Sequence, residues 1–362
     1  MLKRIVRTLG ILFLLGNYGI CHAAGGGETE PLLSKDLKTK VEEAIDKGLK
    51  FLRSQQGEDG SWSHSVGITG LAVKAFMESP RRYTEEDGPF IRKPLEYIVS
   101  KVKPDGSIYD RGLEAYNTSV CLMALKKSGN PKYKPVIENA QNYLIKVQSD
   151  EEEGYTTKDK YYGGIGYGGD ERPDLSNLQW ALEALKSSDL PVNAPTWDKA
   201  IGFIQRTQNR SESNDLVWAG NDGGFVYEPG DSKAGGTISY GSMTYAGLLS
   251  FIYANVNKKD ERVQAAYQWI RQHYTVEENP MMGSQGLYYY YHTFSKALKA
   301  YGEPYIEDAK GVKHNWREEL AQKILSLQKE EGYWVNENSR WWESDKVLVT
   351  SYTVLALSYL VN

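Results

Sequence analysis

A short glycine-centred turn recurs six times along the chain, and this recurrence constrains the fold more than any other sequence feature. Successive turn glycines are about 46 to 62 residues apart. The copies read Asp59-Gly60-Ser61-Trp62, Asp105-Gly106-Ser107-Ile108, Gly163-Gly164-Ile165-Gly166, Gly223-Gly224-Phe225-Val226, Gln285-Gly286-Leu287-Tyr288 and Glu331-Gly332-Tyr333-Trp334. Self-similarity with a period of this size is typical of repeat proteins, in which each copy is one supersecondary unit.

Each turn lies between two helical patterns of different character. The first turn follows an apolar stripe at helical spacing within 41–52, with Glu and Lys on the opposite face. After every turn comes an eight-residue segment with at most one charged residue: 69–76, 118–125, 178–185, 244–251, 291–298 and 350–357. A helix that is polar on one face lies on the outside of a protein, whereas a helix that is apolar all round is buried. The chain is therefore predicted to form six hairpins of one outer and one inner helix.

Six such hairpins can form an open solenoid or a closed ring. Nearly charge-free inner helices favour closure, because an open concave surface would expose their apolar area to water. We predict an all-α fold, an α/α toroid with inner and outer rings of helices, built as a single domain over residues 24–362. The turn regions 154–174 and 210–239 are long, and insertions in repeat proteins collect on one face, often the binding face.

The first 23 residues have the features of a secretory signal peptide. Lys3, Arg4 and Arg7 precede a short apolar run at 9–16, and cleavage is expected after Ala23. The run is too short for a stable membrane span. The sequence thus predicts export to the periplasm or the extracellular space, with lipidation at Cys21 as the alternative.

Composition excludes some partners and highlights one residue type. The net charge of −4 argues against a nucleic-acid-binding protein. The uncharged stretch 234–257 is rich in Gly, Ser, Thr, Tyr and Asn, so it is expected to be a buried inner helix rather than a membrane span. Tyrosine is the outlier, with 26 residues.

Several segments of the sequence resemble those of a known group of proteins. The segment 47–55, followed by Gly60-Ser61-Trp62, resembles the Gln-Trp repeat of squalene and oxidosqualene cyclases, with weaker copies at 328–334 and 148–155. The chain after the signal peptide resembles the prenyltransferase and squalene-cyclase repeat superfamily. The resemblance implies a double ring of helices around a central hydrophobic cavity.

The resemblance points to Asp174 as a candidate catalytic residue. In squalene-hopene cyclases an Asp-x-Asp-Asp motif near the start of an inner helix protonates a polyene, which requires an unusually strong carboxylic acid. The comparable stretch here is 173–177, where only Asp174 matches, because Ser176 and Asn177 replace the other two carboxylates. The alternative is that Asp174 stabilises the N-terminus of a helix.

A second candidate, His292, follows from the likeness to protein prenyltransferase β subunits, which bind zinc through Asp, Cys and His. Tyr291-His292-Thr293 resembles the segment that carries the family's His, but the expected Asp-x-Cys position holds Gly241-Ser242-Met243. Cys121 lies two repeats away and is expected in the core. No metal and no cofactor are therefore predicted, and His292 either faces the cavity or packs in the core.

The expected function is binding of an apolar or amphipathic, terpenoid-like ligand, without the standard polyene-protonating acid. Tyr240, Tyr245 and Tyr290 are candidate ligand-lining residues, with aromatic packing as the alternative. Asp174 and His292 are expected at one mouth of the ring, where their replacement by Asn and Gln would abolish binding without changing the melting temperature.

Two enzyme classes remain as alternatives. One is an active terpenoid cyclase. The other is a carbohydrate-active enzyme of the α/α-toroid type, in which Glu114 and Asp222 would be the acids. The oligomeric state and the identity of the ligand are not predicted.

Overall fold

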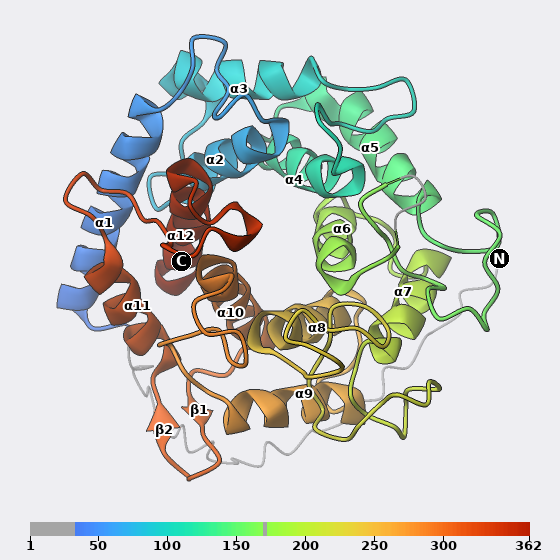
Figure 1. Cartoon of the computed structure of the whole chain (residues 1–362). Helices are drawn as coiled ribbons and strands as arrows, with labels where there is room; N and C mark the ends of the chain where they lie inside the picture. Colours follow the sequence, from blue (N-terminus) through green and yellow to red (C-terminus); the bar gives the residue numbers. More distant parts are fainter. Residues whose placement is uncertain (1–32, 169–171) are drawn as a thin grey trace, which may run out of the picture. The chain divides into compact units, whose positions relative to one another are not determined.

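Two concentric rings of helices make up the part of the chain that the structure describes (Figure 1). The computed structural model describes residues 33–168 and 172–362. The inner ring consists of α2 (Val66–Glu78), α4 (Glu114–Lys127), α6 (Leu175–Ser187), α8 (Gly241–Tyr253), α10 (Leu287–Tyr301) and α12 (Lys346–Val361). The outer ring consists of α1 (Lys35–Ser54), α3 (Pro89–Val99), α5 (Lys134–Lys146), α7 (Pro195–Arg206), α9 (Glu261–Gln272) and α11 (Trp316–Leu327).

The inner ring is closed. Each inner helix packs against the next in sequence order, from α2 to α12, and α12 in turn packs against α2. The outer helix α1 contacts both α11 and α12, so the first hairpin and the last one meet. The predicted all-α toroid of six hairpins is confirmed, and an open solenoid is excluded.

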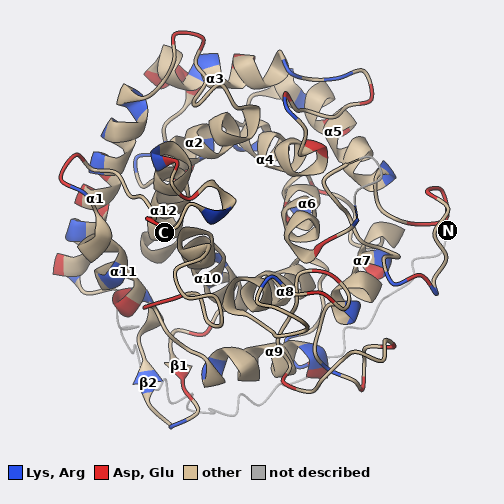
Figure 2. Cartoon of the chain, viewed as in Figure 1, with Lys and Arg blue, Asp and Glu red and all other residues tan. Residues whose placement is uncertain are grey.

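Charge separates the two rings as the sequence predicts. Helix α8 contains no charged residue, and all but its last two residues are buried. Helix α1 buries Val41, Ile45, Leu49 and Leu52 on one face and exposes its Lys and Glu residues on the other. Figure 2 shows the same contrast around the molecule, with most Lys, Arg, Asp and Glu on the outer ring and the loops. Apolar burial therefore holds the inner ring in place.

Non-helical structure is confined to the connections. A small antiparallel pair of strands, β1 (Ile306–Glu307) and β2 (Lys313–His314), lies between α10 and α11. Three short 3-10 turns occupy Glu85–Asp87, Pro131–Tyr133 and Arg340–Trp342. The region predicted to be a signal peptide lies outside the described residues. Within the described part of the chain, no helix has the length and hydrophobicity needed to cross a membrane.

The turn glycines join each hairpin to the next one. In five of the six copies a glycine with φ between +83° and +96° lies directly against the backbone of the following outer helix. At Gly163 a Cβ atom would lie 1.8 Å from the carbonyl oxygen of Lys199, and at Gly332 it would lie 2.7 Å from that of Lys47. The five glycines are Gly60, Gly106, Gly163, Gly223 and Gly332. Any side chain at these positions would push two neighbouring hairpins apart.

A glutamine side chain locks four of these turns. Gln148 Nε2, for example, donates to the carbonyl oxygen of Gly163 at 2.9 Å and to that of Thr196 in the next outer helix at 3.1 Å. Gln56, Gln208 and Gln328 make the equivalent pairs of hydrogen bonds. The bonds from Gln328 end on Gly332 and on Ala44 of α1, so this contact also closes the ring.

Two details of the sequence register need correction. The residues that play the part of Gly60 in the third and fourth copies are Gly163 and Gly223, one position before the predicted turn centres. In the fifth copy Gly286 instead precedes α10 and lies against the ring of Trp341.

We predict that Gly332→Ala destabilises the protein far more than Gly235→Ala. Both glycines have similar positive φ values, +96° and +99°, but a methyl group at Gly235 would have no other atom within 4 Å, whereas one at Gly332 would abut Lys47. The conformational strain alone should cost about 1 kcal/mol at Gly235, and the added backbone clash should raise the loss at Gly332 to about 2–4 kcal/mol. Urea unfolding of the two variants measures the difference, and equal losses would contradict the proposed contact.

Candidate functional site

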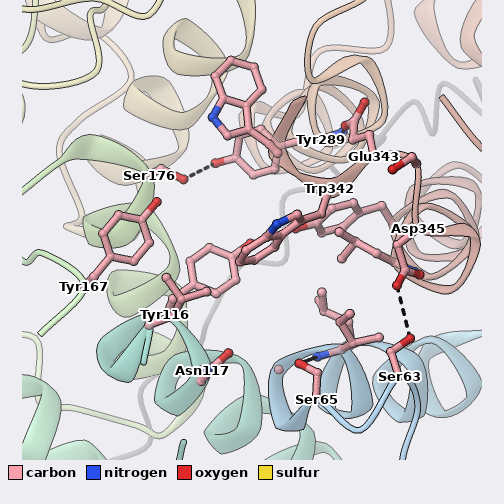
Figure 3. Close-up of a pocket in the computed structure, with 18 of the residues that line it drawn as sticks. Ser63, Ser65, Tyr116, Asn117, Tyr167, Ser176, Tyr289, Trp342, Glu343 and Asp345 are labelled. Carbon is pink, nitrogen blue, oxygen red and sulfur yellow. Dashed lines mark hydrogen bonds between the residues drawn. The ribbon is translucent and has the colours of Figure 1, made fainter. Parts of the chain in front are cut away.

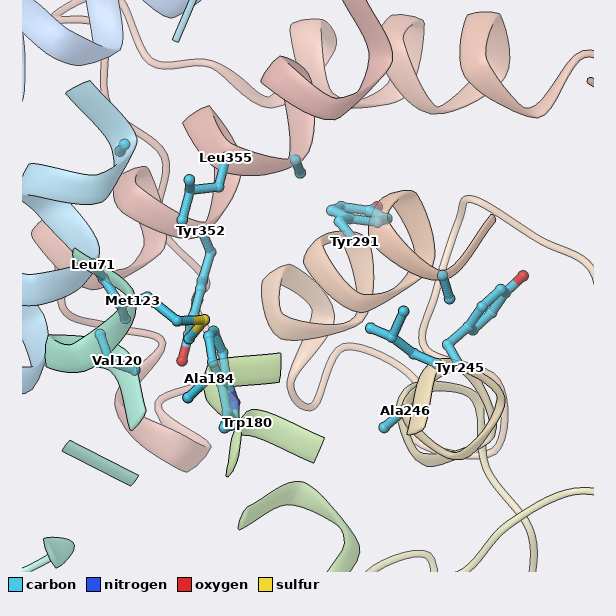
Figure 4. Packing of buried hydrophobic residues seen from close by; sticks show 14 of the residues in the cluster. Leu71, Val120, Met123, Trp180, Ala184, Tyr245, Ala246, Tyr291, Tyr352 and Leu355 are labelled. Carbon is cyan, nitrogen blue, oxygen red and sulfur yellow. The ribbon is translucent and has the colours of Figure 1, made fainter. Parts of the chain in front are cut away.

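The axis of the ring is filled by side chains. Trp180 of α6 stacks on His292 of α10, with ring centroids 5.3 Å apart and planes 13° apart. Tyr116 packs against Trp180 and Tyr352 packs against His292, and the hydroxyls of the two tyrosines share a 2.8 Å hydrogen bond. These four side chains are called the Trp180 column below. Trp180 and Tyr352 converge in the packed interior shown in Figure 4. Ligand space is therefore found at the mouth of the ring rather than along its centre.

A pocket of about 850 Å³ occupies this mouth (Figure 3). The first turns of all six inner helices contribute to it, which places their N-termini around one opening. The long loops of the third and fourth copies add Tyr167 and Tyr227. The segment 341–345, which precedes α12, supplies Trp341, Trp342, Glu343, Ser344 and Asp345.

The pocket wall combines hydrogen-bonding side chains with aromatic rings. The first two hairpins supply Ser63, Ser65, Asp110, Arg111 and Asn117, and the other hairpins add Ser176, Ser242, Glu343, Ser344 and Asp345. The other hairpins supply most of its aromatic rings, namely Tyr167, Tyr227, Tyr240, Tyr289, Trp341, Trp342 and Tyr352. In Figure 3 Ser63, Ser65 and Asn117 lie along one edge, opposite Tyr289, whose hydroxyl is bonded to Ser176.

Three of the helix N-termini around the pocket are capped by side chains. Asp110 accepts a hydrogen bond from the backbone N–H of Val66 in α2, and Asp345 accepts from Val347 and Leu348 in α12. Asn279 accepts in the same way from Ser242 in α8. Since these side chains occupy the positive ends of α2, α8 and α12, these three N-termini do not provide an open anion site.

Asp174 is the N-cap of α6 and is almost completely buried. Its two carboxylate oxygens accept from the backbone N–H of Asn177 at 2.9 Å and from Asn177 Nδ2 at 2.7 Å. Burial raises its pKa to about 6, against the opposing effect of hydrogen bonds from Asn177 and Tyr227. Asp174 does not belong to the pocket lining, but Tyr227 does. Asp174 thus lies behind the pocket wall, where it caps the N-terminus of α6, as the alternative interpretation of the sequence predicts.

His292 lies within the core and not at the pocket surface. Its side chain is fully buried among Trp180, Tyr352 and Tyr359, and neither ring nitrogen has a hydrogen-bond partner among the described residues. Burial and the nearby Lys296 and Lys74 hold the pKa of the imidazole well below its usual range. The structure therefore does not bring Asp174 and His292 together in the lining, contrary to our expectation, and favours the core alternative for His292.

Of the three candidate tyrosines, Tyr240 lines the pocket and the other two do not. The hydroxyl of Tyr290 donates to the carbonyl oxygen of Thr275 at 2.6 Å, so this ring points toward the outer layer. Tyr245 packs against Tyr290 and Phe294 and is directed away from the Trp180 column in Figure 4. The structure thus places Tyr245 and Tyr290 outside the lining of this pocket.

Glu114 and Asp222 are also absent from the lining. Glu114 accepts a hydrogen bond from the hydroxyl of Tyr143, and Asp222 holds a turn by accepting from Gly224 and Ser239. They do not form a pair of acids in this pocket. Among the described residues, no group of three or more His, Cys, Asp or Glu side chains is arranged to hold a metal ion.

The sequence reasoning missed Glu343, which is a buried carboxyl group in the pocket wall. Its exposed fraction is 1%. Oε1 accepts from the backbone N–H of Tyr289 at 2.8 Å, and Oε2 accepts from Asn336 Nδ2 at 2.7 Å. Burial raises the pKa of Glu343 to about 7, although these hydrogen bonds act in the opposite direction.

Backbone strain marks the segment just before Glu343. Trp341 and Trp342 are consecutive residues with positive φ values of 56° and 61°. Each left-handed residue with a side chain costs about 1–2 kcal/mol, and such strain concentrates at functional sites. Both indoles remain partly exposed, at 41% and 63%. The only sequence signal was the Trp-Trp pair itself, which no helical or strand pattern accounts for.

The chain is similar to proteins of known structure and to one known family. The family model of the squalene-hopene cyclase C-terminal domain matches residues 64–225, just under half of the chain. Type II terpene cyclase MstE from Scytonema, in complex with its substrate geranylgeranyl dihydroxybenzoate, superposes with a TM-score of 0.54 at 12% identity, covering 90% of this chain and 99% of that one.

Glycosidases with the same architecture are equally similar. An α-1,6-mannanase of a Salegentibacter species, in complex with α-1,6-mannotriose, has a TM-score of 0.57 at 12% identity and covers 89% of this chain and 100% of that one. A glycosidase in complex with glucose has a TM-score of 0.53 at 12% identity, with 91% and 99% covered. These likenesses establish the α/α-toroid fold. The family match adds a similarity to squalene-hopene cyclases over residues 64–225.

We predict that Asp174 makes stability depend on pH. Its pKa is raised on folding, so the folded state binds the proton more tightly and stability falls as pH rises from about 4 to about 6. A shift of roughly two pKa units corresponds to about 3 kcal/mol at neutral pH. Asp174→Asn keeps a helix-capping side chain but removes this dependence. Urea unfolding at pH 4 and pH 7 should show the wild type losing stability relative to the variant, and parallel curves would refute the assignment.

We also predict that His292→Phe is at least as stable as the wild type. Phenylalanine fills the same stack against Trp180 and removes two buried nitrogens that have no partner. His292→Ala should instead cost about 3–5 kcal/mol through the cavity it leaves. Thermal unfolding compares the two variants, and a similar loss in both would show that the imidazole nitrogens are needed.

Proposed function

We propose that the protein binds an amphipathic, terpenoid-like small molecule in the pocket at the mouth of the ring. The observation that carries this proposal is the composition of the pocket wall, in which eight aromatic rings stand together with hydrogen-bonding side chains. An amphipathic ligand satisfies both kinds of group at once, because its apolar part covers the rings while its polar group bonds to Ser63, Ser65 or Asn117. The volume of about 850 Å³ is within the range of small-molecule sites.

The aromatic rings of the pocket wall can pack against an isoprenoid chain or a fused-ring skeleton. Tyr289 is fixed by a 3.1 Å hydrogen bond between its hydroxyl and that of Ser176, and Tyr116 is fixed by Tyr352. Rings held in this way offer apolar contact area without much loss of side-chain entropy on binding. The similarity to a terpene cyclase that binds a geranylgeranyl compound agrees with this ligand class.

Protonation of an alkene is not favoured by the acids present. That reaction needs a carboxylic acid stronger than usual, whereas burial weakens both buried acids near the mouth, with pKa values of about 6 for Asp174 and about 7 for Glu343. Ser176 and Asn177 also leave Asp174 without neighbouring carboxylates. We therefore propose a binding protein, or an enzyme of another kind, rather than a polyene cyclase. Export remains part of the proposal, on the basis of the N-terminal sequence.

The test is binding of geranylgeraniol to the purified chain by equilibrium dialysis. Trp342→Ala should weaken binding about 10-fold or more, since a partly exposed indole in the pocket wall is lost. Tyr97→Ala, on the outer helix α3, is the matched control and should leave binding unchanged. Equal affinity of the wild type and Trp342→Ala would contradict the proposed site. Incubation with squalene should give no cyclic product, and formation of one would favour an active cyclase instead.

A further inference from the structure

Two carboxyl groups of one short segment face the mouth pocket. Glu343 and Asp345 are two residues apart, and both contribute to the lining. Their surroundings differ, because Glu343 is buried whereas Asp345 is partly exposed. Pairs of carboxyl groups in unlike environments are the usual means by which proteins divide acid and base roles.

The two carboxyl groups of this segment contact different parts of the wall. Glu343 accepts a hydrogen bond from the backbone N–H of Tyr289, at the start of α10. Asp345 caps α12 with Oδ1, and its Oδ2 accepts from the hydroxyl of Ser63 at 3.2 Å. Figure 3 shows Asp345 between Glu343 and Ser63. A ligand whose apolar part lies against Tyr289 and whose polar group lies near Ser63 would place the bond between these parts next to the two carboxyl groups.

Glu343 is held rigidly in place. The backbone N–H of Tyr289 and the side chain of Asn336 fix its two oxygens, and the backbone N–H of Asn336 donates to its carbonyl oxygen at 2.9 Å. The Trp341–Trp342 turn, in which both residues have positive φ, directly precedes Glu343 and directs the chain into the pocket wall. Strain that persists beside a pocket is a sign that the segment is retained for function rather than for stability.

The surroundings of Glu343 favour its protonated form near neutral pH. Burial raises its pKa to about 7. The titratable side chains that face it are Tyr288 and Tyr291 of α10 and Tyr352 of α12, and the pKa of each is raised, so they carry no charge. An acid of this strength is too weak to protonate a carbon–carbon double bond, but it suits protonation of an oxygen that leaves as an alcohol.

We propose that the mouth pocket hydrolyses amphipathic glycosides, with Glu343 as the general acid and Asp345 as the general base. Glu343 donates its proton to the glycosidic oxygen as the bond from this oxygen to the anomeric carbon breaks, and the apolar part leaves as an alcohol. A water molecule forms the new bond to the anomeric carbon and gives its proton to Asp345. Proton exchange with solvent then restores both groups. The aromatic faces stabilise the positive charge that develops on the sugar.

This proposal rests on the proposed binding function, and one experiment distinguishes their failures. The full chain is incubated separately with the dodecyl glycosides of glucose, mannose and galactose in both anomeric forms, and dodecanol release and binding are measured in parallel. We expect dodecanol from at least one glycoside, with a rate that falls as the pH rises through about 7, because Glu343 loses its proton there. Absence of binding would refute the proposed ligand site. Binding without release from any of the glycosides would overturn the hydrolytic proposal alone.

Variants test the individual roles. Glu343→Gln should lower the rate of dodecanol release at least 100-fold while binding persists. The loss should be much smaller for the matching 4-methylumbelliferyl glycoside, whose leaving group needs little protonation, and a purely structural role would lower both rates equally. Asp345→Asn should slow both substrates. Asp260→Asn, which alters a helix cap on the outer helix α9, is the control and should leave the rate unchanged.

Two outcomes would overturn the assignment of the acid. One is an unchanged rate in Glu343→Gln. The other is an equal loss with both leaving groups. If this variant does not fold, the wild-type pH profile remains decisive, since a rate that does not fall between pH 6 and pH 8 excludes Glu343 as the acid.

Discussion

The close contact between a turn glycine and the backbone of the next outer helix is the constraint on which the ring depends. It recurs at five of the six turns and leaves no room for a side chain. Each contact sets the distance between one hairpin and the next, and the contact of Gly332 with Lys47 joins the last hairpin to the first. The glutamine clamps add directional hydrogen bonds at four of these turns. A repeat chain without such fixed spacing would have no reason to close after six copies.

Closure also decides where a ligand can bind. The inner helices approach closely enough for Trp180, His292, Tyr116 and Tyr352 to fill the axis. Two buried ion pairs, Lys296–Glu183 and Lys74–Glu78, lie further along the same helices. What stays open is the mouth where the six N-termini converge, and there capping side chains leave the wall aromatic and polar rather than cationic.

The sequence predicts the architecture better than the site, for physical reasons. Charge-free segments must be buried wherever they occur, so six of them at a regular period indicate an inner ring without knowledge of any contact. The lining residues depend on rotation about a helix axis: Tyr289 faces the pocket, whereas Tyr290, the next residue in a run of four tyrosines, faces the outer layer. Glu343 was beyond sequence reasoning, because its burial arises when an irregular segment folds onto the start of α10, more than 50 residues earlier in the chain. Asp174 was found through a family resemblance, and the structure shows a helix cap behind the wall.

A crystal structure of the protein with bound geranylgeraniol tests the central claim most directly, namely that the ligand site is the mouth and not the axis of the ring. The expected result is ligand density across the mouth, with the isoprenoid chain against Trp342 and Tyr289 and the hydroxyl group near Ser63, Ser65 or Asn117, while the Trp180–His292 stack is unchanged. Ligand density along the axis, with Trp180 and His292 displaced, would contradict it.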